Sequence, residues 1–236
     1  MVTAMTFTLI AIDRQTGEIG ATSASMWPAL GSVLPRFRPG VGLVVTQHYA
    51  HLMMAETMLS ELEQRHGLEH PGHLATSISS FVPSSRQYGY ATLDGHLFGW
   101  TGDACEPVNG HFADDDCVAI GNMLANDRVL PAMVERFSST SGPLCDRLLS
   151  ALMAGDAMGG DRRGRLSAFV QVWAPTYPDV DECPIDFRVD LHDRPVQALT
   201  EILTEYRAQP RPMPWQPSVK LPPLDSATKN RPESQD

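Results

Sequence analysis

Hydrophobic residues recur along the chain in short runs that polar turn residues interrupt. Runs rich in apolar and β-branched residues, bounded by Gly, Pro and Asp, are typical of strands. The first two runs are separated by a turn-forming segment and predict a hairpin, and Asp94-Gly95 is a strong hairpin signal between two later runs. The strands expected from this pattern are Thr6–Ile12, Ile19–Ser25, Val41–Gln47, Gln87–Leu93, His96–Trp100, Cys117–Ile120, Ser167–Ala174 and Phe187–Leu191.

Apolar residues at spacings of three and four predict amphipathic helices between the strand runs. One such series begins at Leu52 and ends before Gly67. Further helices are expected over Pro71–Phe81, Arg128–Phe137, Pro143–Ala154 and Pro195–Arg207. Strands thus come in runs separated by helix pairs, whereas a doubly wound parallel sheet alternates single strands and helices. The order favours an α+β protein, a four-layer αββα sandwich of two mostly antiparallel sheets.

The proline content of the chain rises near its end. Seven of the 19 prolines lie in the last 28 residues. Such a composition buries too little apolar surface to offset the entropy of ordering. We therefore expect one folded domain over residues 1–208 and an extended or disordered tail over residues 209–236.

Composition and charge exclude several functional classes. The chain has 236 residues, of which 42% are hydrophobic, and its apolar runs are far shorter than the roughly 20 residues of a membrane-spanning helix. The 28 acidic residues outnumber the 18 basic ones, giving a net charge of −10 without any basic run, so neither nucleic acid nor a membrane is expected as a partner. The N-terminus lacks the basic and apolar segments of an export signal, which predicts a cytoplasmic location.

Three groups of residues resemble metal or thiol sites but lack the pattern that such sites need. His66, His70 and His73 have helix-like spacing, yet glycines and a proline between and beside them break any helix that would align them. Asp114–Asp116 are adjacent carboxylates typical of a solvated turn. The four cysteines form no C-x-x-C pair, and Cys105 is expected to be structural. We expect no metal and no cofactor.

Several short segments carry a family resemblance through their order and spacing. They are Thr6-Phe7-Thr8-Leu9-Ile10-Ala11, Gly17-Glu18-Ile19-Gly20, Leu34-Pro35 to Gly40-Val41-Gly42, Thr46-Gln47, Gly121-Asn122-Met123-Leu124 and Gly159-Gly160-Asp161-Arg162-Arg163-Gly164-Arg165. Together they resemble the DUF1028 family, an uncharacterised group of the N-terminal-nucleophile (Ntn) hydrolase superfamily. The resemblance covers about Thr6 to Tyr206 and implies the αββα sandwich and amide-bond hydrolysis.

Two further points of the resemblance concern the substrate. Some family members carry an additional domain that resembles peptidoglycan-binding domains, which hints at cell-wall amides. We expect no such domain in this chain, because only the proline-rich segment follows Tyr206. It also has Leu166 before Ser167, where the family usually has Gln, so its substrate choice is expected to differ if that Gln contacts substrate.

Thr6 occupies the position that the superfamily uses for its nucleophile. There, an N-terminal Thr, Ser or Cys attacks the substrate and its own α-amine acts as the general base, since that amine has a pKa near 7.7–8.0. Five residues precede Thr6, so its nitrogen is an amide unless self-cleavage, or translation from Met5 and removal of that Met, exposes it. The alternative is an ordinary β-branched strand residue.

The glycine-rich segment over residues 159–165 is the most distinctive stretch of the chain. Its glycines allow close backbone approach to a ligand, and three guanidinium groups would suit a carboxylate or a developing oxyanion. We expect Arg162, Arg163 and Arg165 to bind substrate and Asp161 to take part in catalysis. The alternative is a solvated basic turn that Asp161 holds in shape.

Four further polar residues are candidates for the same site. Asn122 could donate to an oxyanion or cap a helix. Ser23 and Ser25 alternate on one strand, so both are expected on the face beside Thr6, where they leave room for substrate or simply pack. Gln47 ends a buried strand and needs a partner or ligand. We predict that Thr6, both serines, Asn122 and the Asp161–Arg165 turn converge on one cleft.

Two functions remain open from the sequence. The first is an Ntn-type amidohydrolase that acts on a small amide or peptide-like substrate, including cell-wall-derived fragments, with Thr6 as nucleophile. The second is a non-catalytic protein that binds a small molecule and keeps Thr6 blocked. A methionine-rich helix and potentially open sheet edges also predict a homodimer.

Overall fold

The computed structural model describes residues 6–49, 52–65, 83–174 and 185–208, and its strands form two sheets in which every neighbouring pair is antiparallel. The six-stranded sheet has the order β10-β9-β2-β1-β8-β7, with bounds Ile185–Val189, Ser167–Trp173, Ile19–Ser25, Thr6–Ile12, Cys117–Gly121 and Gly110–Asp114. The four-stranded sheet has the order β3-β4-β5-β6, with bounds Pro35–Arg38, Gly42–His48, Arg86–Thr92 and Leu97–Thr101.

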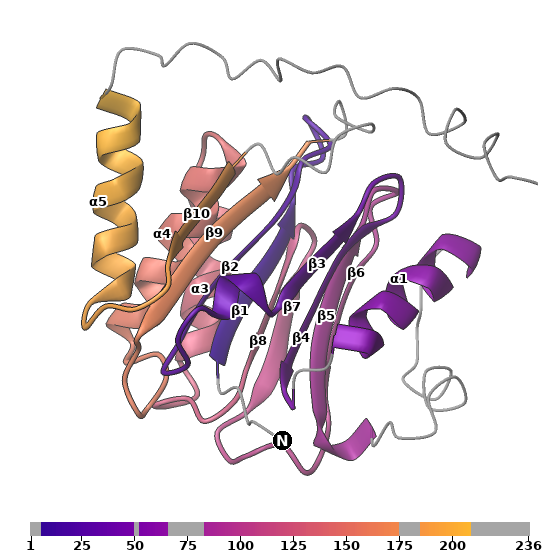
Figure 1. The fold of residues 1–236 in the computed structure, drawn as a ribbon, viewed down its shortest axis with the longest axis horizontal. Helices are drawn as coiled ribbons and strands as arrows, with labels where there is room; N and C mark the ends of the chain where they lie inside the picture. Colours follow the sequence, from indigo (N-terminus) through magenta and orange to yellow (C-terminus); the bar gives the residue numbers. More distant parts are fainter. Residues whose placement is uncertain (1–5, 50–51, 66–82, 175–184, 209–236) are drawn as a thin grey trace, which may run out of the picture.

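Helices cover the outer face of each sheet (Figure 1). The helices α3, α4 and α5 lie on the six-stranded sheet, and α1 lies on the four-stranded sheet. Their bounds are Leu52–Arg65 for α1, Val129–Ser139 for α3, Leu144–Ala157 for α4 and Pro195–Ala208 for α5; two short 3₁₀ helices are η1, Leu30–Ser32, and η2, Pro83–Ser85. The layers therefore follow the order α-β-β-α, and the αββα sandwich predicted from the sequence is confirmed.

The apolar residues of the first strand, β1, pack into two different cores. Phe7 and Leu9 of β1 belong to the core beneath α3 and α4, whereas Ile10 and Ile12 belong to the core between the two sheets. Successive side chains point to opposite faces of a strand, so a strand with both faces covered is apolar on both. By the same alternation, Thr6 faces the space between the sheets.

Two strands were not predicted, and both lie at sheet edges. These are β3 and β7, at the outer positions of the four-stranded and six-stranded sheets. Apart from them, the predicted strands and helices within the described residues are present, with ends that differ by at most three residues. The predicted helix Pro71–Phe81 and the tail 209–236 lie outside the described residues. Within the part of the chain that the structure describes, no helix is long and apolar enough to cross a membrane.

Candidate functional site

Polar residues gather at one end of the space between the sheets, the lower end in Figure 1. There β1 begins at Thr6 and β2 ends at Ser25, and the register pairs these two residues. Thr8 pairs with Ser23 in the same ladder. The strand alternation that placed both serines beside Thr6 is therefore observed.

Thr6 is fixed through its backbone, while its hydroxyl is left unpaired. The carbonyl oxygen accepts hydrogen bonds from the backbone N–H of Asn122 at 3.1 Å and from Nε2 of Gln47 at 3.4 Å. The side chain is fully buried, and its Oγ1 has no hydrogen-bond partner among the residues described. A buried polar atom without a partner costs about 1–3 kcal/mol, so its presence requires an explanation.

Gln87 joins the polar side chains of this end. It lies opposite Gln47 in the pairing of β4 with β5 and is fully buried. Its Nε2 donates to the carbonyl oxygens of Gly121 at 2.8 Å and Gly110 at 3.1 Å, and to Oγ1 of Thr101 at 2.8 Å. Its Oε1 accepts from Nε2 of Gln47 and from Nδ2 of Asn122, each at 2.7 Å. Gln87 was not identified from the sequence.

These contacts fix the orientation of the Asn122 side chain. Backbone carbonyls only accept hydrogen bonds, so Gln87 must turn its Nε2 towards Gly110 and Gly121 and its Oε1 towards Asn122. Asn122 must then face Gln87 with its donor, Nδ2. Its Oδ1 is buried without a hydrogen-bond partner in the described chain. Asn122 therefore presents an unpaired acceptor, and the second N–H of Nδ2 is a further donor.

Two of the residues predicted to bind substrate are bonded inside the protein. Oε1 of Gln47 accepts from Oγ1 of Thr8 at 2.7 Å. Oγ of Ser23 donates to the carbonyl oxygen of Phe7 at 2.9 Å and lies 2.8 Å from Oγ1 of Thr8. These bonds hold the polar residues around Thr6 in place. Gln47 and Ser23 therefore have a supporting role in the site.

The glycine-rich turn packs on the strand ends that carry Thr6 and Asn122. The backbone N–H of Arg162 donates to the carbonyl oxygen of Met123 at 3.1 Å, and Asp161 forms a β-bridge with Leu124. Gly160 has φ 51°, and a Cβ there would lie 2.6 Å from the ring of Phe7, so only glycine fits. The turn thus packs beside the start of β1.

Asp161 is a buried anchor for this turn. It is 1% exposed, and its carboxylate accepts from the backbone N–H of Met26 at 3.1 Å. It also accepts from Arg163, through the backbone N–H at 3.0 Å, Nε at 3.1 Å and Nη2 at 2.8 Å. A carboxylate with these four donors ties the turn to the end of β2.

The three arginines of the turn differ in their partners. Arg163 pairs with Asp161, and Arg165 pairs with Asp156 of α4. Arg162 is exposed, and the described residues offer it no ion pair. The sequence predicted the same substrate-binding role for all three arginines. In the structure, Arg162 is the one of the three that has no carboxylate partner among the described residues.

Several residues around this end have strained backbones. Met123 has φ 50°, His48 has φ 64° and the β-branched Val108 has φ 57°. Met123 follows Asn122, and His48 follows Gln47. The carbonyl oxygen of Val108 accepts a hydrogen bond from the backbone N–H of Leu124. Positive φ is costly for such residues and persists where the surroundings enforce it, often at functional sites.

The described cysteines are unsuited to act as nucleophiles. Cys105, Cys117 and Cys145 are buried, and Sγ of Cys105 donates to the carbonyl oxygen of Arg86 at 3.4 Å. Burial raises the pKa of Cys117 to about 12 and that of Cys145 to about 11, and it also raises the pKa of Cys105.

We expect these three thiols to react slowly with thiol reagents in the folded protein. A pKa raised above the working pH lowers the thiolate fraction, so near pH 8 modification of Cys117 and Cys145 should be at least about 100-fold slower than that of an exposed cysteine. Mass spectrometric mapping after iodoacetamide treatment would locate the label, and the urea-unfolded protein is the control. Rapid native labelling of any of the three would contradict this assignment.

The other charged clusters among the described residues carry no metal arrangement. Asp116 pairs with Arg14 at 2.7 Å, and Asp114 accepts from Oγ of Ser138 at 2.7 Å, as in the solvated turn expected from the sequence. Within the described ranges, no group of three or more His, Cys, Asp and Glu side chains is placed to hold a metal ion. The predicted histidine group at residues 66, 70 and 73 lies outside those ranges.

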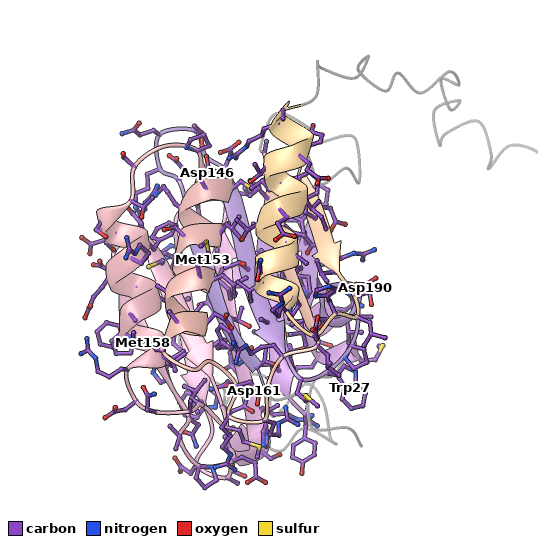
Figure 2. The ribbon with its side chains drawn as sticks, turned by 90° about the vertical axis from the view of Figure 1, so that its left-hand side faces the viewer. Trp27, Asp146, Met153, Met158, Asp161 and Asp190 are labelled. Atoms are coloured by element: carbon purple, nitrogen blue, oxygen red, sulfur yellow. The ribbon has the colours of Figure 1, made fainter. Side chains whose placement is uncertain are left out.

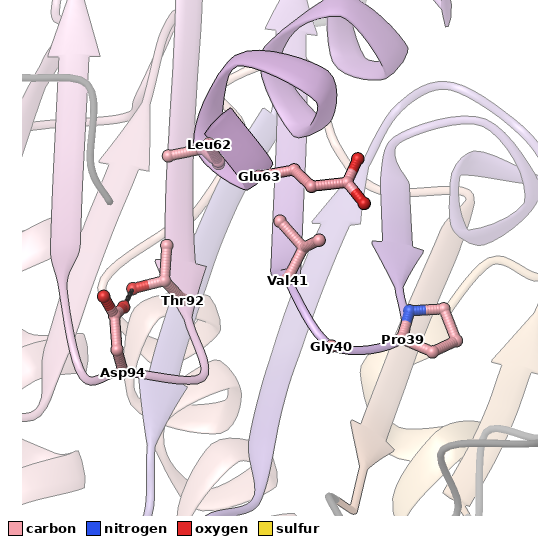
Figure 3. A pocket seen from close by; sticks show the side chains of 7 residues that line it. All are labelled: Pro39, Gly40, Val41, Leu62, Glu63, Thr92 and Asp94. Atoms are coloured by element: carbon pink, nitrogen blue, oxygen red, sulfur yellow. Dashed lines mark hydrogen bonds between the residues drawn. The ribbon is translucent and has the colours of Figure 1, made fainter. Parts of the chain in front are cut away.

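A cavity of about 210 Å³ lies away from Thr6, near the turn between β5 and β6 (Figure 3). Its two carboxylates already have partners, since Asp94 accepts from Thr92 and Glu63 pairs with Arg38 at 3.1 Å. Its lining residues are Pro39, Gly40, Val41, Leu62, Glu63, Thr92 and Asp94. The unpaired buried atoms therefore favour the Thr6 end as the candidate site.

Comparisons with known proteins identify a family and two solved structures to which the chain is similar. The family model described as "Family of unknown function (DUF1028)" matches residues 6–199. The crystal structure of a DUF1028 protein from Silicibacter pomeroyi superposes with a TM-score of 0.74 and 28% identity, covering 87% of this chain and 91% of that chain. Anbu (ancestral beta-subunit) from Yersinia bercovieri gives a TM-score of 0.40 and 16% identity, covering 92% of this chain and 100% of that chain. The comparison with curated proteins gives no match.

Proposed function

Because the chain belongs to the DUF1028 family, whose function is unknown, we propose an activity from the site itself: an N-terminal-nucleophile amidohydrolase in which Thr6 attacks once it is the first residue. The observation that carries this proposal is the buried hydroxyl of Thr6, which has no partner among the described residues and lies on a backbone fixed by Asn122 and Gln47. The match to the family model also begins at residue 6.

The proposed reaction uses groups of this chain and water. The free α-amine of Thr6 accepts the hydroxyl proton while Oγ1 attacks the amide carbon, and the amine then passes that proton to the leaving nitrogen. The unused N–H of Asn122 Nδ2 is the proposed donor to the oxyanion. Water, deprotonated by the same amine, hydrolyses the resulting ester and restores Thr6. Asp161 takes part as the anchor of the glycine-rich turn.

We propose a small amide or peptide-like substrate, and cell-wall-derived fragments belong to that class. Ser25 and the Asp161–Arg165 turn lie around Thr6 and are the proposed surroundings of such a substrate. A homodimer and a cytoplasmic location stay predictions.

A second candidate is a non-catalytic protein that binds a small molecule. It is favoured by the state of the full-length chain, in which Thr6 is fully buried and its nitrogen is an amide. An amide nitrogen cannot act as the base. Oγ1 of Thr6 and Oδ1 of Asn122 would then pair with the ligand.

The state of the N-terminus distinguishes the two candidates. A chain translated from Met5, from which the host aminopeptidase removes Met5, should hydrolyse amides that the full-length chain does not. Equal activity of both chains would place the nucleophile elsewhere. The intact mass of the protein isolated from its own host is the second measurement: a chain that begins at Thr6 supports the enzyme, and one that begins at Met1 or Val2 supports the binding protein.

A further inference from the structure

The glycine-rich turn holds one arginine that forms no ion pair with any described residue. We propose that this residue, Arg162, binds a carboxylate of the substrate, so that the site takes an amide with a free carboxylate close to the scissile bond. This inference rests on the proposed function of the same site and specifies its substrate class.

The neighbouring arginines have structural partners that explain them. Arg163 reaches Asp161 with both Nε and Nη2, which is the two-pronged geometry that fits a carboxylate. Arg165 pairs with Asp156 and donates to the carbonyl oxygen of Gly159 at 3.4 Å. These two arginines fasten the turn, to the buried Asp161 and to α4. Only Arg162 remains exposed without an ion pair in the described part of the chain.

Two hydrogen bonds connect the backbone of Arg162, through Met123 and Asn122, to that of the candidate nucleophile. Its backbone N–H donates to the carbonyl oxygen of Met123, at 3.1 Å. The preceding residue, Asn122, donates from its own backbone N–H to the carbonyl oxygen of Thr6, also at 3.1 Å. The side chain therefore starts from a backbone position that is fixed relative to Thr6. A guanidinium stays charged at every working pH, so it can hold a carboxylate throughout the reaction.

Exposed apolar side chains lie on the other side of the same turn. Met26 and Trp27 follow Ser25 and are 36% and 39% exposed. The N–H of Met26 is bonded to Asp161, and the N–H of Trp27 donates to Oγ of Ser25 at 3.0 Å. Figure 2 shows Trp27 and Asp161 at the same end of the molecule. An exposed cation and two exposed apolar side chains thus flank the Asp161 turn, a combination that fits a molecule with a carboxylate near an apolar group, such as an acylated hydrophobic amino acid.

The negative charge of the whole chain makes the binding of an anionic substrate more dependent on Arg162. A net charge of −10 repels anions at long range, so an anionic ligand needs a local positive group. With Arg163 and Arg165 neutralised, Arg162 supplies that group within the turn. Replacing it should therefore remove most of the preference for a carboxylate.

Calorimetric titration of the chain that begins at Thr6 tests this directly. The probes are N-acetylphenylalanine and its carboxamide, in which a neutral amide replaces the carboxylate. The unaltered chain should bind the carboxylate at least about tenfold more tightly, the range expected for a charge-assisted hydrogen bond. Arg162→Gln should abolish the difference, and Arg162→Lys should keep part of it. Arg14→Gln, an exposed arginine in the turn between β1 and β2, is the matched control and should change nothing.

The outcomes separate this inference from the proposed function. If neither probe binds, or if Arg162→Gln keeps the preference while its circular dichroism is unchanged, the inference is wrong. If the carboxylate binds through Arg162 but no chain hydrolyses any amide, the inference stands and the proposed activity fails. If neutral amides are hydrolysed as well as acidic ones, the activity stands and the inference fails.

Discussion

Thr6→Ala in the chain that begins at residue 6 should reduce kcat/KM for amide hydrolysis by roughly 10³-fold or more, because it removes the attacking oxygen. Thr6→Ser keeps a hydroxyl and should retain part of the activity. Thr6→Val keeps the β-branched shape of the strand residue but not the hydroxyl, so it should be as inactive as Thr6→Ala. Steady-state kinetics on a panel of amides would measure all three.

The same variants contain the control for folding. Thr6 has no side-chain hydrogen bond to lose among the described residues, so removing its hydroxyl should leave the free energy of unfolding unchanged or slightly higher. Unfolding in urea would measure this. An active Thr6→Val variant would show that the hydroxyl is not the nucleophile, and a strongly destabilised one would show that Thr6 has a structural role.

Gln87→Leu should lower the free energy of unfolding by more than about 3 kcal/mol, because several groups at this end of the core each lose a hydrogen bond and an unpaired buried group costs about 1–3 kcal/mol. These groups are the carbonyl oxygens of Gly110 and Gly121 and the side-chain amides of Gln47 and Asn122. Urea unfolding with fluorescence detection is the measurement. Gln171→Leu is the matched control, since Gln171 is 5% exposed and donates only to Asp186 among its described contacts. It should cost less than about 1.5 kcal/mol.

A positioning role for Gln87 makes a second, separable prediction. Gln87→Glu keeps an oxygen that accepts from Gln47 and Asn122 but loses the donors to Gly110 and Gly121. If Gln87 orients Asn122, Gln87→Glu should retain more of kcat than Gln87→Leu when both are measured under conditions where they are folded. Equal kcat values for the two variants would contradict the orienting role, whatever their stabilities.

The sequence predicts the fold well where burial leaves a clear pattern. Strands such as Thr6–Ile12 are apolar on both faces because one face packs on helices and the other between the sheets. The two missed strands lack this pattern. In β3, Arg36 and Arg38 alternate with Pro35 and Phe37, and in β7 four of the five residues are exposed. An edge strand that packs against few neighbours buries few side chains, so its sequence shows no clear hydrophobic pattern.

The candidate site is only partly predictable for a different reason. The shared face of Thr6 and the two serines follows from the period of two along paired strands. Gln87 is one polar residue in a strand, and its role depends on the registers that bring Gln47, Asn122 and two backbone carbonyls to it. The partner of Arg165 lies on another element, α4. The spacing of residues along the chain does not indicate these contacts between distant segments.

The centre of the six-stranded sheet joins segments that are made at very different times during translation. β1 and β2 are produced first, yet they pair with β8 and β9. Oγ1 of Thr22 in β2 bonds the carbonyl oxygen of Phe169 across 147 positions. Sheets dominated by such distant pairings fold slowly, because the chain must close large loops before any contact compensates the lost entropy.

This order of synthesis sets a time limit on how Thr6 can be exposed. At about 5–20 residues per second, the ribosome needs at least about 7 s to pass from Thr22 to Phe169. During that interval the nascent β1 lacks β9 and cannot complete the sheet that buries Thr6. Because Thr6 is buried once the sheet is complete, we expect an aminopeptidase to remove Met5 during or soon after synthesis and self-cleavage to occur in the folded chain. Pulse-labelled nascent chains would consequently begin at Thr6 in the first case and carry the longer N-terminus in the second.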